Sequence, residues 1–518
     1  MSAVPGVATA PAPAPAELVG AERMLGAIAL AGATFMTVLD VTIANVAIPT
    51  IAGDLGVSPT QGTWIITSFT VANAIALPLT GWLTTRFGQV RLIVASILLF
   101  TLASWLCAIA PGMDALIACR VLQGLVAGPM VPLSQSLLLT TFTRERAGFA
   151  LALWSMTALV APISGPLIGG WITEEASWPW IFYINIPVGL LAAAVIWQIY
   201  RRRESATRKV PMDVVGLVLL VLWVGALQIM LDKGKELDWF GSGEIIALTC
   251  VALVGFALFL AWELLDNPHP IVDLSLFGVR NFWSATLTLS IGYAVFFASI
   301  VILPLWLQTL MGYTQTWAGI MQAPFGLLVL LIAPFIGRGI QRNDPRTIAC
   351  AGFLIFSLVS FMRAGFDLHA DAWTIAVPMF IQGAANVMFF LPLTALALSG
   401  LASERIPAAT GLNNFARYTA GAFGASISIT LWADRTKLHR AHLAEYVTSN
   451  DPATASALSA LQGAGFTPEQ AIAEIDRMVE AQARMLGTID LFWMAGVLFI
   501  LLAALVWIAR PSKGRSQA

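Results

Sequence analysis

The chain has 518 residues, of which 58% are hydrophobic and only 11% charged, with a net charge of −1. Charged residues make up about a quarter of a soluble protein, so this composition excludes a soluble globular chain. The near-zero net charge gives no indication of nucleic acid as a partner. The four cysteines lie in apolar segments without metal-ligand spacing, so neither a disulfide framework nor a metal site is predicted.

The N-terminal residues 1–23 are expected to form a disordered cytoplasmic tail. They are rich in proline and alanine, a composition typical of semi-extended chain. No basic segment precedes an apolar run here, which argues against a cleavable signal peptide. Residues 510–518 are expected to be a second, shorter cytoplasmic tail.

Long apolar segments dominate the rest of the chain. A helix needs about 20 apolar residues to cross the hydrocarbon core, where only its own hydrogen bonds satisfy the backbone. The predicted fold class is therefore an all-α membrane protein with fourteen transmembrane helices. The segments lie at about 24–49, 62–82, 91–110, 114–141, 148–172, 180–200, 213–231, 243–262, 282–303, 316–337, 347–365, 372–399, 408–431 and 488–509.

The distribution of lysine and arginine predicts the orientation of these spans. If the N-terminus is cytoplasmic, 18 of these residues fall in inner segments, whereas the short outer loops hold only Lys233 and Lys235. Positive residues are retained on the cytoplasmic side of membranes, so both termini are predicted to be cytoplasmic.

One outer loop, residues 432–487, is much longer than the others. Within it Thr467 and Gln470 flank Pro468 and Glu469 as an N-cap and an N3 residue would, which predicts a helix that continues into the last span. His439 and His442 are three residues apart, a spacing better explained by a solvated helix face than by a metal site without a third ligand.

Three charged residues are predicted at membrane depth, where each needs a partner or a water-filled cavity. Asp40 and Arg120 each lie about nine residues from the outer end of their spans, so they sit at similar depth and can pair if spans one and four are neighbours. A carboxylate that alternates between an arginine-paired and a protonated form would couple proton entry to a change of shape. The alternative is a static ion pair. Arg417, near the middle of its span, either faces the cavity or satisfies carbonyls at a kink.

Glycine and proline are concentrated in the segment 161–170. Small residues allow close helix packing and prolines bend helices, so this span is expected to contribute to switching or simply to a tight crossing. The residues concerned are Pro162, Gly165, Pro166, Gly169 and Gly170.

Two short patterns occur once in each half of the chain. The turn Gly81 to Arg91 contains Arg86 and Arg91, and a weaker copy follows another span at Gly337 to Arg342. Gln123-Gly124 is similarly repeated as Gln382-Gly383. Such paired patterns indicate an internally repeated transporter.

Together these motifs resemble the major facilitator superfamily, in particular its fourteen-span drug:proton antiporters. The resemblance rests on Leu39 to Pro49 in the first span, the turn Gly81 to Arg91, Arg120 to Gly124 in the fourth span and Gly165 to Gly170 in the fifth. It extends over about residues 24–509. One position departs from the family pattern, because Thr85 stands where an acidic residue is usual, so Arg86 and Arg91 need another partner.

The resemblance implies a domain organisation and a function. Residues 24–200 and 282–509 would form two six-helix bundles, and residues 201–281 a linker with two inserted helices. The implied activity is exchange of lipophilic or amphipathic drugs for protons across the bacterial inner membrane, driven by the proton gradient without a cofactor. The implied partners are a periplasmic membrane-fusion adaptor and an outer-membrane channel. Implied cavity residues are Phe35, Asn45, Gln123, Trp154, Met156, Phe297, Phe389, Asn413 and Asn414.

Several alternatives remain open at this stage. Each implied cavity residue could instead have an ordinary packing role. A proton-coupled carrier of one defined metabolite, such as a siderophore or a fatty acid, fits the same sequence. A membrane-embedded enzyme is disfavoured because no HExxH, phosphate-binding glycine loop or paired catalytic histidines occur. A channel is disfavoured because no filter motif is present.

Overall fold

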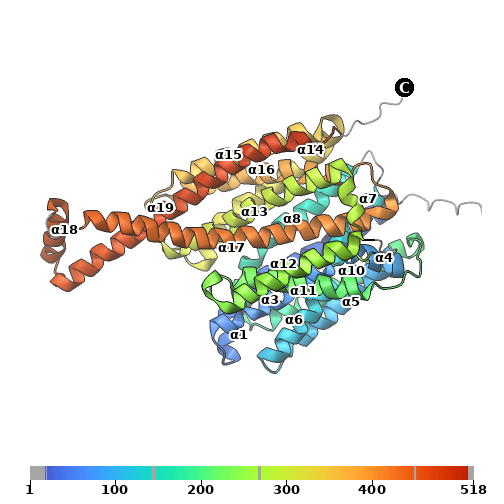
Figure 1. Ribbon diagram of the computed structural model, residues 1–518, viewed down its shortest axis with the longest axis horizontal. Helices are drawn as coiled ribbons and strands as arrows, with labels where there is room; N and C mark the ends of the chain where they lie inside the picture. Colours follow the sequence, from blue (N-terminus) through green and yellow to red (C-terminus); the bar gives the residue numbers. More distant parts are fainter. Residues whose placement is uncertain (1–17, 19, 143–146, 266–269, 449–450, 512–518) are drawn as a thin grey trace, which may run out of the picture.

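The computed structural model describes residues 18, 20–142, 147–265, 270–448 and 451–511, which form nineteen α-helices with short 3-10 turns between them (Figure 1). The predicted N-terminal tail and most of the C-terminal tail lie outside these residues. Eleven helical segments of the described chain are long and apolar enough to cross a membrane. A twelfth results if α3 (Trp64–Ala76) and α4 (Thr80–Phe87), which meet at 62°, form one bent span.

The remaining two predicted spans coincide with α8 (Ala147–Glu175) and α17 (Ile406–Tyr446). Neither is among the segments that pass by length and apolar composition within the described residues, and α17 carries buried polar residues such as Asn414 and Arg417 along its length. The helical fold is confirmed, while the count of fourteen spans stays a prediction.

The helices group into two bundles, each containing six of the predicted spans. The first contains α1 (Gly20–Asp54), α3 with α4, α5 (Gln89–Ala108), α6 (Met113–Ala127) with α7 (Met130–Thr141), α8, and α9 (Trp180–Tyr183) with α10 (Asn185–Tyr200), and the short α2 (Pro59–Gly62) lies between α1 and α3. The second contains α13 (Arg280–Thr309), α14 (Gln315–Arg342), α15 (Pro345–Ala364), α16 (Ala372–Leu398), α17 and α19 (Pro468–Leu505). We call the end at which α1 begins and α19 finishes the inner end, following the predicted topology.

The two bundles repeat one another in detail. A Cβ atom on Gly124 would lie 2.4 Å from the Phe69 carbonyl oxygen, and one on Gly383 would lie 2.4 Å from the Phe325 carbonyl oxygen. Only glycine permits this approach of two helices, and it occurs at matching places in α6 against α3 and α16 against α14. The repeated pattern in the sequence is therefore a structural repeat.

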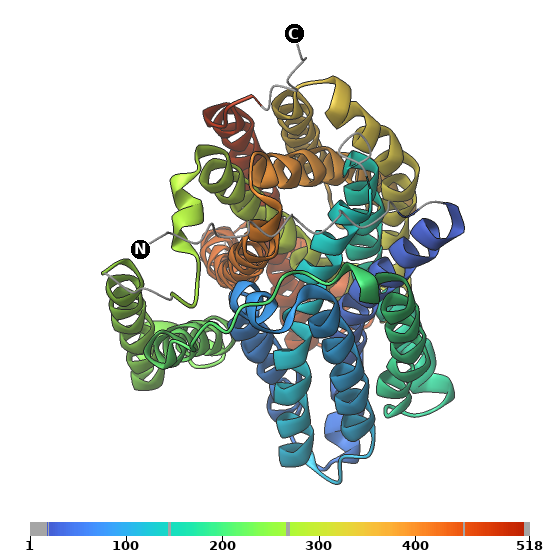
Figure 2. The same ribbon diagram turned by 90° about the vertical axis from the view of Figure 1, so that its right-hand side faces the viewer.

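The linker between the bundles is bound to the first bundle. Glu204 accepts hydrogen bonds from the backbone N–H groups of Val90 (3.0 Å) and Arg91 (2.9 Å) at the start of α5. The following residues stay attached, since Arg208 donates its backbone N–H to the Thr85 carbonyl at 2.9 Å. Viewed from the inner end, the green linker crosses the blue helices (Figure 2). Glu204 is thus the acidic partner that the Thr85 position does not supply.

The inserted helices α11 (Val214–Lys233) and α12 (Gly243–Leu264) form a hairpin beside the two bundles. Near the outer end, Lys233 donates to the Thr63 hydroxyl of the first bundle at 2.6 Å. The Trp239 indole donates to the Thr430 hydroxyl of the second bundle at 2.9 Å. The turn of this hairpin therefore contacts both bundles.

The long outer loop is a helical hairpin. α17 continues to Tyr446, α18 (Pro452–Gly463) forms the tip, and α19 returns into the membrane without a break (Figure 1). The predicted helix start is confirmed, because Thr467 and Gln470 form a reciprocal capping box. His439 contacts Asp490 at 2.8 Å, so it joins the two arms of the hairpin.

We predict that Glu204→Gln lowers the free energy of unfolding by about 1–2 kcal/mol, because the charge and one acceptor at the start of α5 are lost. Thermal unfolding of the purified protein in detergent measures this change. The matched control is Glu445→Gln, an exposed glutamate with no such partner among the described residues. An equal effect of the two substitutions would contradict a specific role for Glu204.

Candidate functional site

The predicted pair of Asp40 and Arg120 is present inside the first bundle. Nη1 of Arg120 lies 2.5 Å from Oδ2 of Asp40, and the two residues are 0% and 2% exposed, respectively. The first half of span four, α6, packs mainly on α3 and α5, whereas its second half, α7, packs on α1, so the pair forms because the long arginine side chain reaches across from α6. Burial removes water from both charges, which makes each dependent on the other.

Neutral side chains complete the coordination of the Asp40 carboxylate. Asn185 and Gln123 donate to its Oδ1 at 2.8 and 3.0 Å. Gln123 also donates to Ser104 at 2.7 Å and accepts from Arg120 at 2.7 Å. Gln123, predicted to line the substrate cavity, is instead a fully buried member of this network. Gln123 is buried here because its amide supplies a hydrogen bond that the Asp40 carboxylate needs.

Aromatic rings and a carbonyl hold the guanidinium of Arg120. Its Cζ lies 4.4 Å from the ring centroid of Phe69 and 5.6 Å from that of Phe182. Nε donates to the Ile65 carbonyl at 3.0 Å. Nη2 has no hydrogen-bond partner in the described structure. This donor group is thus unsatisfied in a dry site, which favours any rearrangement that brings water or another acceptor to it.

The sequence motifs do not identify Asn185, Ser104, Phe69 or Phe182 as members of this site. Asn185 was detectable as a single amide in an otherwise apolar span at 180–200, but nothing in that pattern indicates its partner. Phe69 and Phe182 are indistinguishable in sequence from ordinary apolar packing residues. The missed residues all depend on contacts between helices far apart in the chain.

A second cluster lies between the two bundles. Trp154 of α8 stacks on Phe390 of α16 with ring centroids 5.9 Å apart. Asn414 of α17 donates to Gln135 of α7 at 3.2 Å. Both contacts join one bundle to the other, so any separation of the bundles at this level must break them.

Arg417 borders this interface. Its Cζ lies 4.5 to 4.9 Å from the ring centroids of Tyr418, Tyr293 and Phe390, and Nη2 donates to the Asn414 side chain at 2.5 Å. Among the described residues no carboxylate forms an ion pair with it. The guanidinium of Arg417 is thus enclosed by aromatic rings, which stabilise a desolvated cation. This environment differs from the two predicted ones, a cavity-facing position and a contact with carbonyls at a kink.

The inner end of the interface is closed. A Cβ atom on Gly148 would lie 1.9 Å from the carbonyl oxygen of Gly337, and one on Gly81 would lie 2.7 Å from the Ala408 side chain. Backbones of the two bundles therefore touch at the inner end. The two arginines of the turn between α4 and α5 contact the linker instead, with Arg86 donating to the Val210 carbonyl at 3.3 Å and Arg91 lying 3.9 Å from Glu204.

The other predicted cavity residues have different environments. Phe297 is half-buried and stacks on Tyr293, beside Arg417. Asn413 bonds to Thr286 within the second bundle at 2.9 Å. Phe389 is 0% exposed and stacks on Phe353, so it belongs to the bundle core rather than to a cavity. Sequence could not distinguish these positions, because an aromatic residue in a span gives no sign of which face it occupies. Phe35 and Met156 are half-buried, and Asn45 is exposed.

The glycine-rich span packs against α1. A Cβ atom on Gly165 would lie 2.1 Å from the Thr42 hydroxyl, and one on Gly169 would lie 3.3 Å from Ile43, whereas Gly170 has open space beside it. Gly165 and Gly169 therefore pack closely on α1, whereas Gly170 does not pack against a neighbouring helix. The side chains of Pro162 and Pro166 lie outside the described residues.

Comparisons with known proteins agree with this architecture. The sequence model of the Major Facilitator Superfamily matches residues 30–425. The multidrug export protein EmrB of Escherichia coli (strain K12) is 48% identical over 502 residues, covering 96% of this chain and 97% of EmrB. The fatty acid resistance protein FarB of Neisseria gonorrhoeae is 45% identical over 494 residues, covering 95% and 97% of the two chains.

A solved structure supports the fold. The proton:xylose symporter XylE bound to 6-bromo-6-deoxy-D-glucose matches with a TM-score of 0.59 and 12% identity, covering 94% of this chain and 95% of its own. At that identity the likeness concerns the fold alone. The family model, the relatives and the paired bundles lead to one conclusion: this chain belongs to the Major Facilitator Superfamily, a family of multi-pass membrane transporters rather than enzymes.

Proposed function

We propose that the protein is a proton-coupled exporter of lipophilic and amphipathic toxic compounds that works by alternating access. The observation that carries this proposal is the buried pair of Asp40 and Arg120, with an unsatisfied arginine donor beside it. Ionisable groups at membrane depth are costly to maintain, and proton relays are one of the uses that offset this cost. The similarity to EmrB, a multidrug export protein, supports export as the direction of transport.

The geometry supports a specific coupling step. With the inner end closed, the carboxyl group of Asp40 is hydrogen-bonded to Arg120, Gln123 and Asn185. Protonation removes the attraction for Arg120 and releases the guanidinium toward other acceptors. Because Arg120 is held on α6 and Asp40 on α1, this exchange changes how these helices are connected. Proton binding thereby alters the relative stability of the inward- and outward-open states.

The interface between the bundles suits lipophilic substrates. Phe390 contacts Arg417 and stacks on Trp154 of the other bundle, so separation of the bundles would expose both aromatic rings beside the cation. Burial of apolar area is undirected and tolerates ligands of varied shape. The alternative is a carrier of one defined metabolite. The similarity to FarB, a fatty acid resistance protein, favours a fatty acid as that metabolite.

We further propose that the protein lies in a bacterial inner membrane with both termini in the cytoplasm and joins a periplasmic adaptor and an outer-membrane channel. The helical hairpin of α17, α18 and α19 supports this arrangement, since it extends beyond the outer ends of the other helices (Figure 1). Exposed apolar side chains on the hairpin include Tyr446, Phe466, Ile472 and Met478. Exposed apolar surface on an otherwise polar hairpin is typical of a protein contact.

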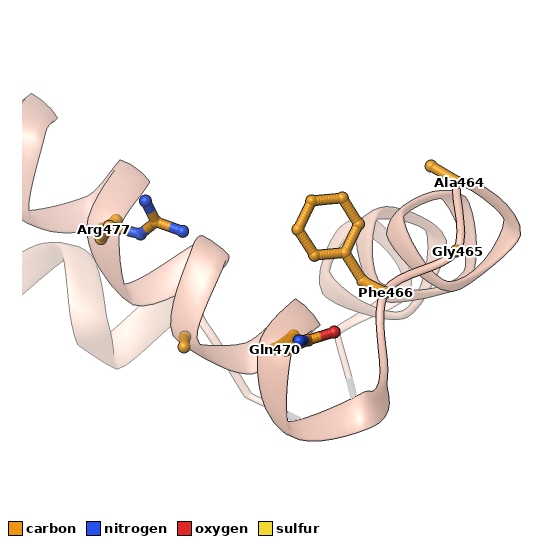
Figure 3. Close-up of a pocket in the computed structure, with 6 residues that line it drawn as sticks. Ala464, Gly465, Phe466, Gln470 and Arg477 are labelled. Atoms are coloured by element: carbon orange, nitrogen blue, oxygen red, sulfur yellow. The ribbon is translucent and has the colours of Figure 1, made fainter.

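The tip of the hairpin contains a hollow of about 320 Å³. Phe466 borders it from the connection between α18 and α19, and Arg477 borders it from α19 (Figure 3). A half-exposed ring beside a guanidinium offers both apolar and charged contacts, the residue types enriched where proteins bind one another. The hollow is therefore the part of the hairpin that we expect to contact the adaptor.

We predict that Asp40→Asn abolishes efflux driven by a pH gradient, because asparagine has no proton to exchange, while the protein still folds. Uptake of a lipophilic dye that the wild type transports, measured in inverted membrane vesicles, tests this. Asp54→Asn is the matched control, since Asp54 is an exposed carboxylate at the end of the same helix. Uphill transport retained by Asp40→Asn would reject Asp40 as the proton carrier.

We also predict that replacing residues 440–480 by a short linker separates transport from resistance. The cut leaves the contacts of Trp432 with Thr488 (2.9 Å) and Arg435 with Asp490 (3.8 Å), so the membrane ends of the hairpin stay joined. Proteoliposomes should retain proton-coupled efflux, whereas intact cells should lose drug resistance and the adaptor should no longer co-purify. Wild-type recovery of the adaptor would place its docking site elsewhere, for instance on α11 and α12.

A further inference from the structure

The second bundle contains a buried cation that the coupling step does not use. Arg363 lies in the last turn of α15, near the outer end, and is 1% exposed. Its guanidinium hydrogen-bonds to Gln382, and its Nε has no hydrogen-bond partner. Among the described residues no carboxylate forms an ion pair with it. The negative end of the α15 helix dipole offsets only part of such a charge.

The structural repeat shows how the matching glutamine is held in the first bundle. α5 and α15 both have 20 residues, and Cys107 and Arg363 are the second-last residues of each. Cys107 contacts Gln123 at 3.7 Å, as Arg363 contacts Gln382. The guanidinium that bonds to Gln123 belongs instead to Arg120, which is paired with Asp40. Arg363 thus places a cation on the matching glutamine without the carboxylate that accompanies the cation in the first bundle.

An apolar cavity of about 240 Å³ lies between α13, α17 and α19 and is separated from Arg363 by the ring of Phe492. Its lining includes Ile427 and Leu498, which are 49% and 43% exposed on the outside of the bundle, so the cavity opens toward the hydrocarbon. Phe492 is one wall of the cavity, and its ring centroid lies 5.7 Å from Cζ of Arg363. A single aromatic ring thus touches both the cation and the cavity.

The cation is level with the outer end of the cavity. Trp306, four residues beyond the lining residue Ile302, stacks on Phe366, three residues beyond Arg363. From Ile302 the lining of α13 continues inward to Ala294. The arrangement is a charge near the membrane surface with apolar space extending from it toward the membrane centre, which is the orientation of an amphiphile in the outer half of the bilayer.

We propose that this cavity binds a long-chain monocarboxylate, with the carboxylate on Arg363 and the chain between α13, α17 and α19. The free Nε supplies a charge-assisted hydrogen bond, and rotation of the Phe492 ring opens the path. The carboxylate is the smallest anionic head group, whereas a phospholipid head group would need more room than the buried guanidinium offers. As a route for export this site rests on the proposed function, but binding can be measured independently of transport.

The test uses the full-length protein in phosphatidylcholine nanodiscs and a photoreactive C12 fatty acid as the probe. We expect crosslinks on α13, α17 and α19, and competition by dodecanoate but not by dodecanol. Arg363→Gln should lower labelling by roughly tenfold, the loss of one charge-assisted contact. Because Arg363→Gln can also impair folding, Ile427→Trp fills the cavity from an exposed position and should lower labelling similarly.

The matched control is Leu358→Trp, a 56% exposed position on α15 outside the cavity lining, which should label like the wild type. Unchanged labelling in folded Ile427→Trp would overturn the proposal. So would equal competition by dodecanol, or competition by phosphatidylglycerol as strong as that by dodecanoate, which would indicate a lipid site. Loss of labelling in Ile427→Trp with efflux intact would support binding at this site but reject it as a route for export. Asp40→Asn should bind the probe like the wild type, so a failure of this site can be distinguished from a failure of proton coupling.

Discussion

The desolvation of one carboxylate determines how the first bundle is built. Asp40 is removed from water, so its charge must be met by Arg120 and its remaining lone pairs by Asn185 and Gln123. These partners come from α6 and α10, and Ile65, whose carbonyl holds Arg120, comes from α3. A change in the charge of Asp40 is therefore felt by four helices at once, which is what a proton-driven change of shape requires.

The two bundles share a framework but differ in where charge is placed. Gly124 and Gly383 make the same close approach to a neighbouring carbonyl, so the backbones correspond. In the first bundle the buried arginine faces a carboxylate, whereas Arg363 and Arg417 in the second have no carboxylate partner among the described residues. This asymmetry is consistent with a division in which the first bundle handles protons and the second handles ligands.

The parts of the structure that follow from local rules could be predicted from sequence. The Asp40–Arg120 pair follows from equal depth in the membrane, and the start of α19 follows from the capping pattern at Thr467. Contacts between distant segments could not be predicted in the same way. Glu204 replaces the acidic residue absent at Thr85 from a linker more than a hundred residues away, and Phe389 turns into the bundle core although its spacing allows either face.

The central claim is that Asp40 alternates between an ion-paired and a protonated state. Infrared difference spectroscopy of the protein in proteoliposomes tests it directly by following the carbonyl band of protonated carboxyl groups as pH falls. The account predicts a band that is missing in Asp40→Asn and that appears at higher pH in Arg120→Ala, because loss of the cation favours the protonated form. If Asp40 stays ionised over the whole pH range in which transport occurs, the pair is a static link between helices and the account is wrong.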